Sequence, residues 1–399
     1  MELVLSLVLV VIMACACAAG GLSEVDKGGL LWKAANYERV MQARHLRDGG
    51  LVSGGSDFPF SRGQEREDDE NAPYLTGAYL ASLSFRYAVT HEPEAQEQAK
   101  KCAASLRKLV EVTGSRGYLA RWWRPLAKDA PAKEGWLSDS WRTSGSYEWM
   151  GNPSVDQYTG VMFGYSVYYD LAADEWEKKL AAKAVGEMIG RILDADMRIL
   201  DPEGKPTSWY DMNPETLQDP VYAPSALHLL KVASQVTGEK RFEDKYRELA
   251  LKHDYLKRSV KRRGDPDWNR SDDVMSFESF YTTIMHEKDP EIRKGLVTAL
   301  HVNWEDVRDD GRYLFGIFYD ALCPGSNQCE MAIQELADYP SHKITIGDRE
   351  QADAPVPAWQ RSYGWFEFMC DTQMRVRGGE QAGVDYLLAY WMARYHGLI

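Results

Sequence analysis

Acidic residues stand at two places where helices are expected to begin. Asp69 belongs to an acidic run just before a helix expected over residues 72–88, and Asp156 lies in the first turn of a helix expected over residues 155–171. Asp is common at helix starts because its carboxylate accepts hydrogen bonds from unpaired backbone N–H groups. Two carboxylates that meet across one cavity can instead act as acid and base on a glycosidic bond. The sequence therefore predicts either helix caps or a catalytic pair at Asp69 and Asp156.

Aromatic residues are the second group that could carry function. The chain contains 13 Trp and 22 Tyr, and many of them lie in polar segments between helices. Rings in such positions can stack on sugar faces, although packing in a core explains most Trp residues in proteins. We expect a binding cleft lined by Trp141, Tyr158, Trp209, Arg361 and Trp365. The same composition also occurs in protein interfaces.

The elements that must position these residues are helices in pairs. Six times, an apolar helix with small residues is followed by a polar turn and a more charged helix. The expected pairs are 72–88 with 94–112, 155–171 with 174–193, 222–236 with 241–255, 273–285 with 290–304, 313–322 with 328–336, and 358–376 with 380–396. A further helix is expected over residues 27–46, and residues 343–346 are the one plausible short strand.

A series of hairpins forms either an open solenoid or a closed ring, because each hairpin must bury its apolar side against its neighbours. Long connectors between the pairs and irregular helix lengths favour the ring. The helices with small residues would form its inner layer, and the charged helices its outer layer. Every long connector would then lie on the same face. We therefore predict an all-α, (α/α)6-like toroid of six helical hairpins, with residues 21–399 as a single domain.

The N-terminal segment has the pattern of an export signal. Residues 3–13 form an apolar run that is too short to cross a bilayer, and small residues follow it. This arrangement is typical of a signal peptide, which we place at residues 1–20. The mature protein would be secreted or periplasmic, and Cys15 or Cys17 could alternatively carry a lipid anchor. No later segment is apolar enough to span a membrane.

The remaining cysteines and the charge limit the chemistry further. In an oxidising compartment, Cys323 and Cys329 could form a disulfide across the short loop between them, whereas Cys102 and Cys370 are expected to be buried thiols. No cysteine or histidine spacing indicates zinc, and no cofactor is expected. The formal net charge of −13 argues against a nucleic-acid partner, which requires a surplus of Lys and Arg.

Several segments resemble a known group of proteins. They are residues 71–81, 85–90, 156–160, 168–171 and 204–209. Together with the series of hairpins, they resemble the six-hairpin glycosidase-like (α/α) toroids, in an uncharacterised secreted bacterial branch. Hydrolases of this fold that act on unsaturated uronyl sugars use aspartates at inner-helix starts. By this analogy, the resemblance implies a catalytic role for Asp69 and Asp156.

Three functions are consistent with these observations. The first is a glycoside hydrolase that acts on an oligo- or polysaccharide, with Asp156 and Asp69 as acid and base. The second is a non-catalytic glycan-binding or envelope scaffold protein that uses the same aromatic cleft. The third is a lyase or an epimerase, in which Tyr158, Tyr363 or Arg361 would act on a uronate. Carboxyl groups about 5–9 Å apart would favour hydrolysis.

Overall fold

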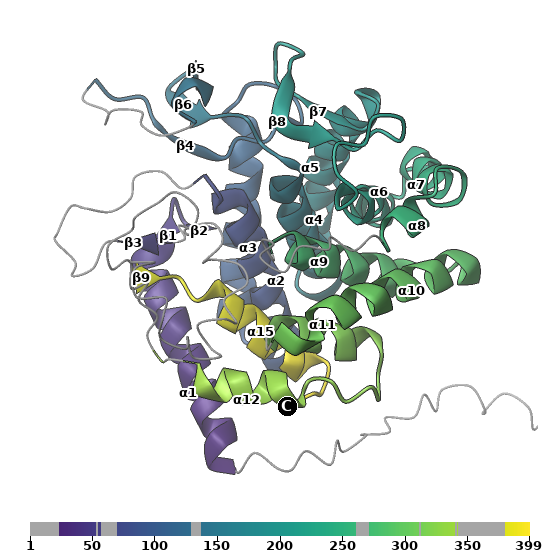
Figure 1. Cartoon of the computed structure of the whole chain (residues 1–399). Coiled ribbons are helices and arrows are strands. Elements are labelled where there is room, and N and C mark those ends of the chain that lie inside the picture. Colours follow the sequence, from purple (N-terminus) through teal and green to yellow (C-terminus); the bar gives the residue numbers. More distant parts are fainter. Residues whose placement is uncertain are drawn as a thin grey trace, which may run out of the picture.

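The computed structural model describes residues 24–52, 55–56, 70–128, 137–260, 271–310, 313–339, 341 and 380–399. Helices make up most of this part of the chain, and small antiparallel sheets lie beyond the ends of several of them (Figure 1). None of the described helices is both long enough and apolar enough to cross a membrane.

Within the described residues, six helices form a closed inner ring. They are α2 (Ala72–Thr90), α4 (Val155–Leu171), α6 (Tyr222–Thr237), α9 (Ser271–His286), α11 (Tyr313–Leu322) and α15 (Val384–Tyr395). Each of them contacts the next one in this order, and α15 returns to contact α2. This closure confirms the predicted toroid, because an open solenoid would leave its first and last helices apart.

The inner helices pack closely because small residues stand at their contacts. Every residue of α2 from Ala72 to Phe85 is buried, and so is every residue of α4 from Gln157 to Tyr168. A Cβ atom on Gly77 would lie 2.1 Å from the carbonyl oxygen of Gly160. Only glycine permits two backbones to approach this closely. The small residues that indicated an inner layer therefore bring α2 and α4 into backbone contact.

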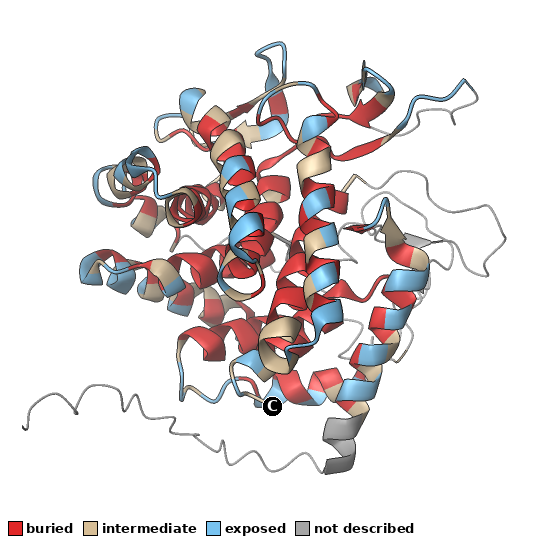
Figure 2. Ribbon diagram, turned by 180° about the vertical axis from the view of Figure 1, so that it is seen from behind, coloured by how far each residue is buried: buried red, intermediate tan, exposed pale blue. Residues whose placement is uncertain are grey.

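The outer helices cover this ring and keep a polar face toward solvent. They are α1 (Glu24–Val40), α3 (Pro93–Glu111), α5 (Glu175–Asp194), α7 (Lys240–Lys252), α8 (Tyr255–Arg258), α10 (Pro290–Val307) and α12 (Glu330–Asp338). Figure 2 shows exposed and buried residues alternating along them, around a buried interior. Side chains cap two of these helices: Asp174 accepts hydrogen bonds from the backbone N–H groups of Trp176 and Glu177 at the start of α5, and Asp289 caps α10 in the same way.

The sequence patterns did not predict most of the strands. The long connector before α4 forms a sheet in the order β4 (Trp122–Pro125), β6 (Tyr147–Met150), β5 (Trp141–Ser144), and the next connector pairs β7 (Arg198–Leu200) with β8 (Pro206–Asp211). These strands lie together beyond the ends of α4 and α5 (Figure 1). The two-residue strands are β1 (Leu46–Arg47), β2 (Leu51–Val52), β3 (Gly55–Ser56) and β9 (Glu380–Gln381). Short π and 3-10 turns complete the description: η1 (Met41–His45), η2 (Ser138–Ser140) and η3 (Arg308–Asp310). The strand expected at residues 343–346 lies outside the described residues.

The last helix has a different place from the one predicted. The sequence pattern assigned residues 380–396 to the outer layer, yet every residue of α15 from Val384 to Ala393 is buried. Helix α1 covers it from outside, and the Tyr386 hydroxyl donates a hydrogen bond of 2.9 Å to the Leu30 carbonyl. Because α15 carries almost no polar face, burial in the inner ring suits it better than the surface does. The helix expected over residues 358–376 lies outside the described residues.

The predicted disulfide is absent, and this prediction was wrong. Cys323 and Cys329 are not bonded to each other. The loop between them is closed instead by Asp320, whose carboxylate accepts hydrogen bonds from the backbone N–H groups of Gln328 at 2.9 Å and Cys329 at 2.8 Å, and from the Ser326 hydroxyl. Hydrogen bonds to a carboxylate hold the turn without a covalent link. Cys102 is a buried thiol, as expected, and Cys370 lies outside the described residues.

Candidate functional site

Asp156 lies half-buried in the first turn of α4, where side chains rather than backbone groups hold it. The Ser154 hydroxyl donates a hydrogen bond to its Oδ1, and Gln157 Nε2 donates to its Oδ2 at 3.0 Å. Among the described residues, no backbone N–H group donates to this carboxylate. Helix capping alone therefore does not explain Asp156, since a cap is defined by hydrogen bonds to backbone N–H groups.

A buried arginine joins the chain before α2 to the start of α4. Arg121 is 2% exposed. It donates to the Asn152 carbonyl at 2.7 Å, to the Glu70 carbonyl at 3.0 Å and to the Ser154 hydroxyl at 2.7 Å. Burial lowers the pKa of Arg121, and the nearby negative charge of Asp156 opposes that effect. The guanidinium thus fixes the backbone around Asp156.

Gln157 makes a second link between the same two segments. Its Nε2 donates at 3.0 Å to Asn71 Oδ1 and at 3.0 Å to Asp156 Oδ2. Asp69 itself lies outside the described residues, so the separation of the predicted pair of carboxylates is not described. Glu70 and Asn71, which directly follow Asp69 in the chain, lie close to Asp156. Arg121 links Glu70 to Ser154, and Gln157 links Asn71 to Asp156.

Trp209 is the most exposed of the described aromatic residues that were predicted to bind substrate. It lies on β8 with 44% of its surface accessible. The neighbouring Ser208 is tied to Asn152, four residues before Asp156, by two hydrogen bonds: Asn152 Nδ2 donates to Ser208 Oγ at 2.9 Å, and the Ser208 N–H donates to Asn152 Oδ1 at 2.8 Å. Trp209 and Asp156 therefore lie at the same end of the ring.

The other predicted binding residues have different surroundings. Trp141 is 8% exposed, and the Arg124 guanidinium lies 4.6 Å from the centre of its ring. Tyr158 is fully buried, and its hydroxyl accepts a hydrogen bond of 3.3 Å from the backbone N–H of Leu119. Both side chains thus support the connectors in this structure. Arg361 and Trp365 lie outside the described residues.

Glu278 is a carboxylate near this site that the sequence patterns did not single out. It lies in α9, is fully buried, and neither of its carboxyl oxygens has a hydrogen-bond partner among the described residues. Burial raises its pKa well above the usual range, and the nearby Tyr74 phenol offsets only part of that effect. One signal could have revealed it: a single Glu within the apolar run from Val274 to Ile284 must be buried if that helix belongs to the inner layer.

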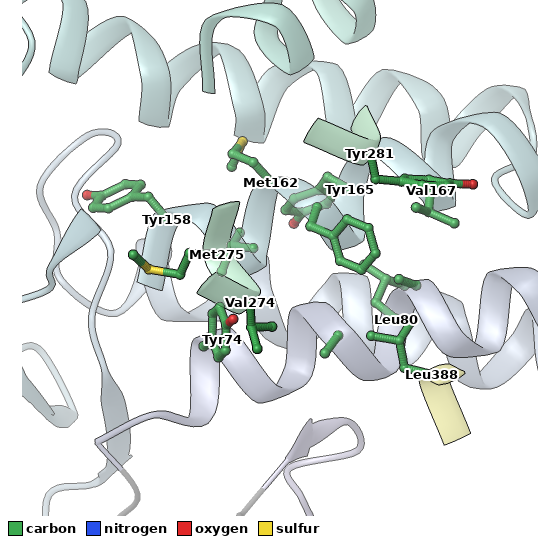
Figure 3. Close-up of a cluster of buried hydrophobic side chains, with 14 of the residues drawn as sticks. Tyr74, Leu80, Tyr158, Met162, Tyr165, Val167, Val274, Met275, Tyr281 and Leu388 are labelled. Atoms are coloured by element: carbon green, nitrogen blue, oxygen red, sulfur yellow. The ribbon is translucent and has the colours of Figure 1, made fainter. Parts of the chain in front are cut away.

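Tyr74 lies within electrostatic reach of both Glu278 and Asp156. It lies at the start of α2, in a buried cluster that includes Val274 and Met275 of α9 (Figure 3). Burial raises the pKa of Tyr74 well above its usual value, and the charges of Glu278 and Asp156 raise it further. One phenol thus interacts with carboxylates on two other inner helices. No group of three or more His, Cys, Asp or Glu residues in the described segments is arranged to hold a metal ion.

Neither a family model nor a curated protein matches the chain. A solved structure of AaCel9A in complex with a cellobiose-like isofagomine is similar to it, with a TM-score of 0.52 and 10% sequence identity over 93% of this chain and 84% of that chain. The chain shares the fold of this structure. It is an (α/α)6 toroid.

Two further solved structures match this toroid. One is a Bacteroides ovatus GH9 protein, with a TM-score of 0.49 and 9% identity over 94% of this chain and 83% of that chain. The other is a metagenome-derived glycoside hydrolase family 9 endoglucanase, with a TM-score of 0.49 and 15% identity over 93% of this chain and 81% of that chain.

Proposed function

We propose that the protein is a carbohydrate-active enzyme that hydrolyses glycosidic bonds in an oligo- or polysaccharide, with Asp156 and Asp69 as its acid–base pair. The observation that carries this proposal is the pair of links between the start of α4 and the chain just before α2. Gln157 bridges Asp156 to Asn71, and Arg121 bridges Ser154 to Glu70. Asp156 is therefore held where the start of α4 meets the chain before α2, and a carboxylate in that place can face a second carboxylate from the other segment.

Covalent geometry supports Asp69 as the partner. Consecutive Cα atoms are about 3.8 Å apart, so the Cα atom of Asp69 lies within about 8 Å of that of Asn71. Asn71 in turn shares the Gln157 amide with Asp156. Glycoside hydrolysis would require the two carboxyl groups to lie about 5–5.5 Å apart in a retaining enzyme and about 6.5–9.5 Å apart in an inverting one.

The chemistry would divide between the two carboxyl groups. Asp156, oriented by Ser154 and Gln157, would accept a proton from the water that attacks the anomeric carbon. Asp69 would donate a proton to the glycosidic oxygen as its bond to that carbon breaks. The exposed ring of Trp209 would stack on a sugar at the same end of the toroid. AaCel9A, which has a similar fold, holds a cellobiose-like isofagomine in its structure.

The test is a screen of the purified full chain against a panel of polysaccharides, read as newly formed reducing ends. Turnover of at least one glycan, abolished by Asp156→Asn, is the expected result. If Asp156→Asn leaves turnover intact, the catalytic assignment is wrong. If no glycan is cleaved but one binds, and Trp209→Ala removes that binding, the protein is a glycan-binding toroid without catalysis.

We also propose that the protein is exported. The apolar run at residues 3–13 and the small residues after it support removal of a signal peptide at residues 1–20. N-terminal sequencing of exported protein is expected to begin near residue 21, and a mature chain that still begins at Met1 would contradict this. Lipidation of Cys15 or Cys17 would be detected as a mass increase together with retention in the membrane fraction.

A further inference from the structure

Asn152 stands where the sheet of the long connector passes into α4. It belongs to the short link between β6, which ends at Met150, and α4, which begins at Val155. Its φ of 58° lies in the left-handed region. Residues other than glycine are uncommon there, although Asn is tolerated better than most. Such a conformation persists only where the surrounding contacts hold it, and positions of this kind gather at functional sites.

The backbone and the side chain of Asn152 are both engaged in hydrogen bonds. Its backbone N–H donates to the Tyr118 hydroxyl at 3.0 Å, and its carbonyl accepts a hydrogen bond of 2.7 Å from Arg121 Nε. Its side-chain amide makes the two hydrogen bonds with Ser208 of β8, at 2.9 Å and 2.8 Å. Because the amide pairs with both the hydroxyl and the backbone of Ser208, it fixes the orientation of β8 as well as its position.

The backbone contacts of Asn152 lead to the candidate carboxylate. Arg121, which holds the Asn152 carbonyl, also donates to the Ser154 hydroxyl at 2.7 Å, and that hydroxyl donates to Asp156 Oδ1. Arg121 and Ser154 are each 2% exposed. Buried side chains that are held by several hydrogen bonds have little freedom to move. The position of Asn152 relative to Asp156 is therefore fixed.

The side-chain contacts lead to the exposed ring of the candidate site. Ser208 directly precedes Trp209, whose ring is 44% exposed. The turn of the β7–β8 hairpin is held separately, because Arg191 of α5 donates to the carbonyls of Leu200 at 3.3 Å and Asp201 at 2.9 Å. Loss of the amide would therefore leave the hairpin attached at its turn, but would release the part that carries Trp209 from the link before α4.

We propose that Asn152 is a positioning residue of the candidate site, which sets the position of the Trp209 ring relative to Asp156. A sugar stacked on Trp209 is thereby aligned with the carboxylate. This inference rests on the proposed function, in which Asp156 is the base and Trp209 binds a sugar. Alignment matters because a misplacement of about 1 Å in a bound substrate can cost about 100-fold in rate.

The test uses Asn152→Gly in the full chain. Glycine adopts the left-handed conformation without strain and keeps the backbone contacts with Tyr118 and Arg121, so the change removes only the two bonds to Ser208. The matched control is Asn327→Gly, the same change at another left-handed Asn, with a φ of 54°, in the loop before α12. Hydrogen exchange of the Ser208 amide, followed by NMR, should be about 5–10-fold faster in Asn152→Gly and unchanged in the control. Unchanged exchange in Asn152→Gly would overturn the proposal.

Turnover separates positioning from a merely structural role. In Asn152→Gly, kcat should fall by about 10–100-fold and by more than KM rises, while the melting temperature stays close to that of the wild type. In a Trp209→Ala background the same change should add little, because the ring that it positions is gone. Losses that multiply in the double variant, or a rise in KM alone, would contradict the positioning role. Should no glycan be cleaved, the proposed function fails by itself, and the exchange of the Ser208 amide still decides whether Asn152 holds the hairpin.

Discussion

The ring of Tyr74 on α2 covers Gly160 on α4 so closely that a Cβ atom on Gly160 would lie 2.1 Å from Cδ2 of that ring. The contact joins the two inner helices whose starts carry the candidate site. It also places the phenol that interacts with Glu278 and Asp156. Packing of the inner ring and arrangement of the site are therefore linked through one aromatic side chain.

The first prediction concerns this contact. Gly160→Ala should lower the free energy of unfolding by about 1–3 kcal/mol, because the base of a buried ring cannot move away from the added methyl group. Gly29→Ala is the matched control: Gly29 lies in α1 with nothing within 4 Å of an added Cβ atom, so this change should stabilise by about 0.5–1 kcal/mol. Urea unfolding of both variants checks the difference, and equal effects would contradict the close contact.

The second prediction concerns Asp156. Asp156→Asn should reduce kcat by about 10²–10⁴-fold with little loss of stability, because the amide keeps the shape but accepts no proton. Asp174→Asn is the control, since Asp174 caps α5 at the opposite end of α4, and Asn caps a helix about as well as Asp. Steady-state turnover and the melting temperature should be measured together. A loss of activity in both variants would point to a general effect on folding.

The third prediction concerns Trp209. Trp209→Ala should weaken glycan binding by about 1–3 kcal/mol, if stacking on a sugar is worth as much as stacking of an aromatic ring on a nucleic-acid base, and leave the melting temperature nearly unchanged. Trp176→Ala is the matched control, because Trp176 is 67% exposed on α5, away from the connectors. Isothermal titration with the glycan found in the screen checks this, and equal losses of affinity would argue against a site near β8.

The fourth prediction concerns the pH dependence of stability. Since burial raises the pKa of Glu278, the folded chain keeps this proton to a higher pH than the unfolded chain. Its contribution is complete below the unfolded pKa, about 4.3, and is lost as pH rises through the folded pKa. The advantage of Glu278→Gln over the wild type should therefore grow by about 1.4 kcal/mol per pH unit across that window.

Glu287→Gln provides a control of opposite sign. Burial alone would raise the pKa of Glu287, but the Tyr246 hydroxyl and Lys231 outweigh it and lower the pKa. Its stabilising contribution is therefore present above the unfolded pKa and is lost as pH falls through the folded pKa. Glu287→Gln should destabilise at neutral pH and become neutral in acid. Denaturant titrations between pH 3 and 8 test both variants, and parallel pH curves for them would contradict the assignment.

The fifth prediction concerns the loop before α12. Alkylation of the denatured chain without a reducing agent should modify both Cys323 and Cys329, because the structure contains no bond between them. Asp320→Ala should destabilise by about 1.5–3 kcal/mol, since it removes the carboxylate that closes the loop. Recovery of the two cysteines as a linked peptide would contradict the structure.

Local patterns in the sequence were enough to predict most of the described helices and their closure into a toroid. Small residues at helical spacing indicated the inner layer, because Gly77 and Gly160 permit a backbone contact that larger residues would block. The sequence also predicted that Asp156 and Trp209 lie at the same end of the toroid. Each long connector runs from an outer helix to the start of the next inner helix, so all of these connectors must lie at that end. Such inferences depend only on neighbouring residues and on chain connectivity, and both can be read directly from the sequence.

Contacts between distant segments were decided only by the tertiary structure. Tyr158 and Trp141 had the composition of binding residues, but long-range packing buries them beneath the connectors. The loop of Cys323 needed no disulfide because Asp320 of α11 reaches its backbone. The side chain that most affects the pKa of Glu278, apart from burial itself, is Tyr74, which lies 204 positions earlier in the chain. Periodicity tells which face of a helix is buried, but the identity of the groups that meet there depends on how all the helices close into one ring.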